Sequence, residues 1–358
     1  MTQIISYANR GYVLQVGDRL VSERRPRQPI TPRDPLFNKH VLFLAKDAIV
    51  SIGFAGLAYV MGVPTDQWIA SVLSGEPLPG PQGGPGRGTR ISTDASGRIF
   101  EAQWPDIGRV TERLQAACNN LYLTLPRRQR EEGLYISIVG WQWKWRWRHG
   151  AGVGHHIRPI VLRVFFNGRA PAISPEQRVE RYWGWEKGRG HLEAVPRMPP
   201  GMLSRLLADL GSRQVVTEDV VERILVEAIQ EIAEEPSRGV GRHCLSVSIN
   251  PRRDPLVRVR YRPLEIGTTG QQAAVGASYS GWIVTPNVTQ APQQISMSPS
   301  FNGQLHAGWF TIGFEGPRRP EDGSGYMGTH RRPSSAVRGL LIETNRGPLR
   351  LASTVRGG

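Results

Sequence analysis

The residues of this chain that could do chemistry lie within positions 2–56, and the first of them is Thr2. A Thr hydroxyl is a poor nucleophile unless a base lies beside it, and a free α-amino group, with an ordinary pKa of about 7.7–8, can be that base. Removal of Met1 would place the amine and the hydroxyl on one residue. The small Thr2 side chain should permit this removal, so we expect an N-terminal nucleophile whose own amine is its base.

Three further residues could complete such a site. A Lys near the amine would lower the pKa of the amine by like-charge repulsion, and an Asp would hold the Lys; Lys39 and Asp18 are available. A glycine at a strand end lets a backbone N–H approach a developing oxyanion, and Gly56 is the candidate. Taken singly, each residue also has an ordinary structural explanation. Asp18 could be a turn residue, Lys39 a solvated charge, and Gly56 part of a tight turn.

The elements that must position these residues are β-strands. Two β-rich runs, 3–7 and 12–19, flank the turn Asn9-Arg10-Gly11, which predicts a hairpin. A second pair of runs, 41–44 and 48–52, follows on either side of a turn. Thr2 therefore opens the first strand, with no leader expected ahead of it.

In order and spacing, these residues resemble the proteasome class of N-terminal nucleophile (Ntn) hydrolases. The class includes the proteasome β subunits and a bacterial proteasome-like peptidase that works with an ATP-driven unfoldase. Its members begin with Thr, carry an Asp sixteen residues later, then a Lys, then Ala-Gly at the end of the fourth strand; Thr2 and Asp18 have this spacing, and Ala55-Gly56 matches the last motif. Lys39 follows Asp18 by a longer interval than is usual in the class. The resemblance is good over residues 2–72, faint to about residue 250 and absent afterwards.

The resemblance implies an α+β fold, a four-layer αββα sandwich in which two stacked antiparallel sheets lie between helix layers. It also implies a threonine peptidase or amidohydrolase. Thr2 Oγ would attack an amide carbonyl with its own α-amine as base through a water, Lys39 would tune the amine and Asp18 would orient Lys39. The Gly56 N–H would receive the oxyanion, and water would resolve the acyl-enzyme. We expect a homo-oligomer, by analogy a ring, with a peptide or amide substrate, an ATP-dependent unfoldase as a candidate partner, and no metal or organic cofactor.

One departure from the class lies late in the chain. Class members carry a supporting Asp and Ser in a loop after a late helix; Glu235 and Ser237 lie roughly there, but the Arg-Asp-x-x-Ser-Gly pattern is absent. An alternative therefore stays open, a catalytically inactive Ntn-fold protein that assembles or scaffolds, as proteasome α subunits do.

Helical periodicity predicts four helices, and Gly- and Pro-rich stretches predict insertions between the elements. The helices are expected at 65–73, 107–121, 202–210 and 220–234. The insertions are expected near 22–36, 75–105 and 167–197 of an Ntn-like domain that spans 1–265. Residues 266–358 are rich in Gly, Pro and Arg, and we expect a partly ordered C-terminal extension, with a separate small β domain as the alternative.

The net charge of +15 and the pI near 10.6 favour acidic partners. Within the strand predicted at 134–148, residues 141–148 alternate Trp with Gln, Lys and Arg. Such residues could stack bases and neutralise phosphates, which keeps a nucleic-acid-binding module as a second alternative. We favour the half-buried strand of a sheet, paired with a strand at 159–166, because the Trp face and the basic face point in opposite directions.

Composition also bears on the compartment. No run of about 18 apolar residues is present, so we expect a soluble, cytoplasmic protein with no membrane partner. Cys118 and Cys244 have no CxxC partner and are expected to be two reduced thiols.

Overall fold

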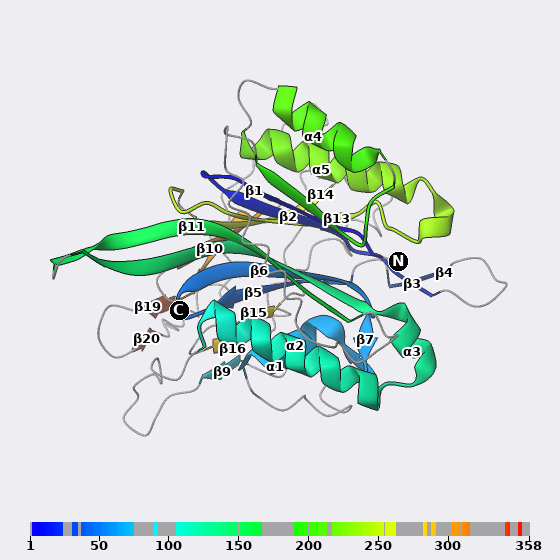
Figure 1. Ribbon diagram of the computed structural model, residues 1–358, viewed down its shortest axis with the longest axis horizontal. Helices are drawn as coiled ribbons and strands as arrows, with labels where there is room; N and C mark the ends of the chain where they lie inside the picture. The colour runs from blue at the N-terminus through cyan, green and yellow to red at the C-terminus, as the bar shows by residue number, and fades with distance from the viewer. Residues whose placement is uncertain are drawn as a thin grey trace, which may run out of the picture.

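Two β-sheets position the candidate site residues: Asp18 and Gly56 end strands of these sheets, and Thr2 and Lys39 lie just before strands. In the computed structural model of the chain, which has mixed α and β structure and mainly antiparallel sheets, these sheets lie face to face (Figure 1). This agrees with the predicted α+β class. The structure describes residues 2–23, 31–34, 37–74, 89–91, 105–148, 151–166, 190–199, 201–212, 217–253, 255–262, 282–284, 288–290, 302–307, 310–315, 341–343 and 350–352.

The first sheet contains the N-terminal hairpin and has the order β12-β1-β2-β13-β14-β18-β17-β19-β20. Its strands are β1 Ile4–Ala8, β2 Val13–Asp18, β12 His191–Val195, β13 Cys244–Ile249, β14 Val257–Arg262, β17 Asn302–Ala307, β18 Phe310–Glu315, β19 Leu341–Glu343 and β20 Arg350–Ala352. The pairs β12–β1, β1–β2, β2–β13 and β13–β14 are all antiparallel.

The second sheet has the order β11-β10-β6-β5-β15-β16-β9. Its strands are β5 His40–Leu44, β6 Ala48–Gly56, β9 Thr89–Ile91, β10 Leu134–Arg148, β11 Ala151–Phe166, β15 Trp282–Val284 and β16 Val288–Gln290. Two small hairpins stand apart from both sheets: β3 Val21–Glu23 with β4 Thr31–Asp34, and β7 Tyr59–Val60 with β8 Val63–Pro64.

Helices cover the outer faces of both sheets. Helices α4 and α5 lie along the first sheet, and α1 and α2 lie along the second (Figure 1). The helices are α1 Thr65–Ser74, α2 Ile107–Thr124, α3 Arg127–Glu132, α4 Met202–Ser212 and α5 Glu218–Ala233, with a short 3-10 turn, η2, at Pro236–Arg238. The four helices predicted from periodicity are confirmed, each to within a few residues.

Local side chains explain where some of these elements begin. Asn9 Oδ1 accepts hydrogen bonds from Gly11 N (2.7 Å) and Tyr12 N (2.8 Å), which closes the predicted β1–β2 turn. Asp106 Oδ1 accepts from Arg109 N (2.9 Å) and so caps the start of α2.

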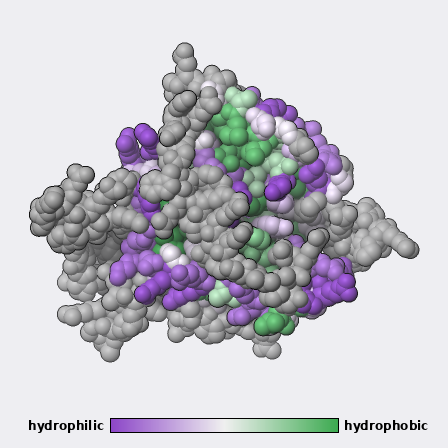
Figure 2. Space-filling model, in the orientation of Figure 1, coloured by the Kyte–Doolittle hydropathy of each residue, from purple (hydrophilic) through white to green (hydrophobic). Residues whose placement is uncertain are grey.

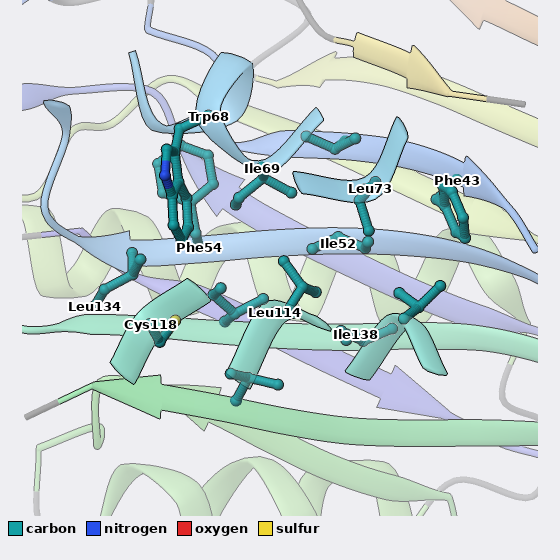
Figure 3. Packing of buried hydrophobic residues seen from close by; sticks show 14 of the residues in the cluster. Phe43, Ile52, Phe54, Trp68, Ile69, Leu73, Leu114, Cys118, Leu134 and Ile138 are labelled. Carbon is teal, nitrogen blue, oxygen red and sulfur yellow. The ribbon is translucent and has the colours of Figure 1, made fainter. Parts of the chain in front are cut away.

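Three large apolar clusters, with a smaller one around Ile4, Ala55 and Val195, fill the spaces between these elements. One lies between α1, α2 and the second sheet, where Phe54, Trp68 and Leu114 converge (Figure 3). Another lies between α4, α5 and the first sheet, and the third lies between the two sheets, where Leu42 and Val247 belong to it. The free thiols Cys118 and Cys244 are buried in the two helix-side clusters. Each sheet therefore buries both faces, as the Val- and Ile-rich strands require.

The strand that contains Trp141, β10, is longer than its sheet neighbour β6. β10 pairs with β6 as far as Gln142, whereas β10 and β11 continue together to Arg148 and Ala151. β11 thus begins eight residues before the predicted start at Pro159, because the hairpin continues past the edge of β6. Trp141 is buried, and its Nε1 donates to Ile249 O (2.9 Å), so this Trp packs between the sheets. The side chains of residues 143–157 lie outside the described residues.

Other predictions fall only partly on described residues. Residues 24–30, 75–88, 92–104 and 167–189, which make up most of the expected insertions, lie outside them. β12, within the insertion expected at 167–197, is an edge strand of the first sheet and was not anticipated. Beyond residue 265, β18 pairs with β14 and β15 pairs with β5, both in parallel. Among the described helices, none is long and apolar enough to cross a membrane.

Part of the surface is apolar. Leu203 and Leu207, one turn apart on α4, are 38% and 44% exposed, and apolar side chains gather over this end of the molecule (Figure 2).

Candidate active site

Asp18 and Lys39 form a buried ion pair. Lys39 Nζ lies 3.0 Å from Asp18 Oδ2, and the two side chains are 2% and 0% exposed. Lys39 Nζ also donates to Leu20 O at 2.6 Å. A buried ammonium requires a counter-ion and further hydrogen bonds, and both are supplied here.

The Asp18 carboxylate accepts from several backbone N–H groups as well. Its Oδ1 accepts from Gln3 N (2.7 Å). Its Oδ2 accepts from Leu20 N (3.1 Å) and from Gly241 N (3.0 Å). This set of donors fixes the carboxylate, and therefore the position of the ammonium that it holds.

Strand order explains how residues distant in sequence meet here. Asp18 is the last residue of β2 in the first sheet, whereas Lys39 immediately precedes β5 in the second sheet. The ion pair therefore bridges the two sheets at one end of both strands. The two residues meet because the sheets stack on each other, since β2 and β5 belong to different sheets and are not hydrogen-bonded to one another.

Thr2 lies beside this pair through the backbone. Its neighbour Gln3 exchanges two hydrogen bonds with Asp18: Gln3 N donates to the carboxylate, and Asp18 N donates to Gln3 O (3.1 Å). Thr2 itself is 8% exposed. The chain direction at Thr2 is thus fixed by the same carboxylate that holds Lys39.

Gly56 ends β6 with φ +98°, in a region that favours glycine. A Cβ at Gly56 would lie 2.3 Å from Gly133 O, so no other residue fits without a backbone shift. Two residues earlier on the same strand, Phe54 N donates to Lys39 O (3.1 Å). The hydrogen bond from Phe54 therefore fixes the end of β6, where Gly56 lies, relative to Lys39. The close approach of Gly133 O explains why residue 56 is a glycine.

Glu235 and Ser237 do not join the pair in any contact of the described residues. Ser237 Oγ donates to Glu235 Oε1 (2.8 Å), and Arg238 pairs with the other oxygen of the same carboxylate. The hydrogen bond from Arg238, and to a smaller extent that from Ser237, lowers the pKa of Glu235. Ser237 and Glu235 are both exposed. The segment that follows them does reach the site, through Gly241.

Sequence reasoning missed the part of Gly241 in this site, where its N–H donates to Asp18. A Cβ at Gly241 would lie 2.5 Å from Leu20 Cβ, and one at Gly17 would lie 2.7 Å from His40 Nε2. The sequence signal for Gly241 is its glycine identity alone. Among the described residues, no group of three His, Cys, Asp or Glu side chains is arranged to hold a metal ion.

No protein-family model matches the sequence, and no curated protein matches it either. Among solved structures, the chain is similar to a Gly-1 mutant of Anbu from Hyphomicrobium sp. strain MC1, with 11% identity, a TM-score of 0.39, and coverage of 70% of this chain and 82% of that one. It is similar to Anbu, described as an ancestral beta-subunit, from Yersinia bercovieri, with 10% identity, a TM-score of 0.39, and coverage of 69% and 81%. It is also similar to eukaryotic HslV from Trypanosoma brucei, with 14% identity, a TM-score of 0.34, and coverage of 69% and 99%. These neighbours are of the proteasome-like class that the sequence resembles, and at such identities they say nothing of activity in this chain.

Proposed function

We propose that the chain is a proteasome-like Ntn hydrolase, a threonine peptidase or amidohydrolase built on an αββα sandwich. Its nucleophile is Thr2 after removal of Met1. The sandwich is supported by the three apolar clusters, two on the helix sides and one between the sheets. The activity is supported by one observation above all, the buried Lys39–Asp18 pair held against the backbone beside Thr2.

The proposed mechanism gives each residue one role. The Thr2 α-amine takes the proton of the Thr2 hydroxyl through a water, and Oγ attacks the carbonyl carbon of an amide. The Lys39 ammonium disfavours protonation of that amine, because burial strengthens the repulsion between like charges. Asp18 holds Lys39 in place, and the Gly56 N–H donates to the oxyanion. The Thr2 ammonium then gives this proton to the leaving nitrogen, the C–N bond breaks to release the amine product, and water hydrolyses the acyl-Thr2 ester that remains.

Intact mass of untagged protein is the first test, followed by labelling with a peptide epoxyketone, which reacts with an N-terminal Thr through both its hydroxyl and its amine. We expect a mass short by one Met and a single adduct on Thr2. Thr2→Ala should abolish the adduct. Thr111→Ala, a substitution of a buried Thr whose hydroxyl donates to Ile107 O within α2, is the matched control and should keep it. Quantitative retention of Met1 would leave the Thr2 hydroxyl without its base and would refute the proposed hydrolase activity.

The position of Ser237 and Glu235 favours a second candidate, an inactive Ntn-fold assembly protein. These residues contact each other and Arg238 at the surface, and no hydrogen bond of the described residues joins them to Thr2. If the chain is an inactive assembly protein, the wild type should not react with the epoxyketone, and Thr2→Ala should form the same oligomer as the wild type. Native mass spectrometry of both proteins, with and without epoxyketone, separates the two candidates.

Assembly and domain organisation are proposals as well. We propose a homo-oligomer, by analogy with the class a ring, that acts on peptide or amide substrates, with an ATP-dependent unfoldase as a candidate partner. We also propose that residues 266–358 extend the 1–265 domain rather than form a separate β domain. The pairing of β18 with β14 and of β15 with β5 supports the extension.

A further inference from the structure

A row of polar side chains crosses the otherwise apolar space between the two sheets. In the first sheet, Glu193, Ser6 and Gln15 lie side by side on β12, β1 and β2. In the second sheet, Arg163, Ser137, Gly53 and His40 lie side by side on β11, β10, β6 and β5. The two rows face each other, because Ser6 Oγ lies 3.0 Å from Ser137 Oγ and Arg163 pairs with Glu193.

Gln15 is the centre of this row. Its Nε2 donates to Ser137 O (3.1 Å) and to Ser6 Oγ (3.1 Å). Its Oε1 accepts from Ser51 Oγ (2.7 Å) and lies 3.1 Å from His40 Nδ1. A carbonyl oxygen such as Ser137 O can only accept, so the orientation of the Gln15 amide is fixed, and His40 Nδ1 must carry the proton.

His40 is held neutral in this tautomer. Burial, with the neighbouring Lys39 and Arg19 charges, lowers the pKa of His40 to about 3. The other ring nitrogen, Nε2, is buried and has no hydrogen-bond partner among the described residues. An apolar side chain would avoid that cost, so stability alone does not account for a His at this position.

Two glycines make room for the row. A Cβ at Gly17 would lie 2.7 Å from His40 Nε2, and a Cβ at Gly53 would lie 2.9 Å from Gln15 Oε1. The absence of a side chain at Gly17 on β2 and at Gly53 on β6 thus leaves space for Gln15 and His40 to form their hydrogen bond between the sheets.

The row joins the strands that carry the ion pair. Gln15 is three residues before Asp18 on β2, and His40 directly follows Lys39 at the start of β5. We infer that Gln15 and His40 are positioning residues, whose cross-sheet hydrogen bond holds Lys39 against Asp18. A hydrogen bond suits this role because it depends on direction and distance, whereas apolar contacts tolerate sliding. The effect on Thr2 rests on the proposed function; the effect on Lys39 does not.

The test compares His40→Leu and Gln15→Met, which remove the hydrogen bond, with His40→Asn, whose amide N–H can replace Nδ1–H. Val247→Ala is the matched control, since Val247 lies beside Gln15 in the first sheet and is 1% exposed. Lysine acylation by acetic anhydride is read by peptide mass spectrometry, with the exposed Lys46 as internal reference. We expect Lys39 acylation to rise roughly tenfold in His40→Leu and Gln15→Met, because the pair opens more often, and to stay near wild type in His40→Asn and Val247→Ala.

Two results would overturn the inference: acylation of Lys39 in His40→Leu and Gln15→Met no faster than in Val247→Ala, or no recovery in His40→Asn. If His40→Leu does not fold, Lys39 acylation in Gln15→Met, which loses the hydrogen bond, is compared with that in His40→Asn, which can keep it. A second readout is the pH midpoint of epoxyketone labelling. It should move upward in Gln15→Met, toward the ordinary amine pKa of about 7.7–8, and not in Val247→Ala. A wild type that does not label would refute the proposed hydrolase, while Lys39 acylation would still decide the positioning role.

Discussion

Lys39 and Asp18 belong to different sheets, yet their side chains meet at 3.0 Å in a position closed to solvent. The carboxylate of Asp18 accepts from three backbone N–H groups besides the ammonium, and one of these is the N–H of the residue after Thr2. The pair thus connects the N-terminus, both sheets and the loop at Gly241.

Lys39→Met should destabilise the protein strongly. It leaves the Asp18 charge buried without its counter-ion, and breaking a buried pair from one side typically costs about 3–5 kcal/mol. Urea unfolding of Lys39→Met, Asp18→Asn and the double variant checks this. The double variant should be more stable than the sum of the single losses predicts; simple additivity would mean that the two side chains do not interact.

Gly56→Ala should lower the free energy of unfolding by about 1–3 kcal/mol, because it combines a positive φ with a clash against Gly133 O. Gly211→Ala is the control. Gly211 lies in α4, and a Cβ there would meet nothing within 4 Å. This variant should be neutral or more stable by up to about 1 kcal/mol. Equal effects of the two substitutions would contradict the steric role of Gly56.

Ser237→Ala should change stability by less than about 0.5 kcal/mol and leave epoxyketone labelling intact, because Ser237 is exposed and bonds only locally to Glu235. Ser246→Ala is the matched comparison. Its hydroxyl is buried and donates to the buried Glu222, so its loss should cost about 1–3 kcal/mol. A large loss of labelling in Ser237→Ala would show that Ser237 supports Thr2 after all.

His40 makes a specific contribution to the pH dependence of stability. Its pKa is about 3 when folded and about 6.5 when unfolded, so the stability it contributes is complete above pH 6.5 and is lost as the pH falls toward 3. Between pH 7.5 and pH 5 this amounts to about 2 kcal/mol. His40→Asn should remove that component while the other titrations stay the same. Parallel curves of unfolding free energy against pH for the two proteins would refute a buried neutral His40.

What the sequence by itself determined is local. The turn at Asn9 and the helices with apolar faces follow from neighbouring residues, because strand alternation and helical period act over a few residues. The candidate set Thr2, Asp18, Lys39 and Gly56 rested instead on a resemblance in order and spacing. The pairing of Asp18 with Lys39 was also predicted, because a Lys near the amine needs an Asp to hold it.

What only the tertiary structure decided involves residues far apart in the chain. Gly241 reaches Asp18 across 223 positions, and Gln15 meets His40 only because the two sheets stack face to face. Glu235 and Ser237 lie roughly where the sequence suggested a supporting pair, but both are at the surface. Strand β12 forms within a segment that was expected to be an insertion. A contact between sheets depends on how two packed faces are aligned, and no local pattern of side chains encodes that alignment.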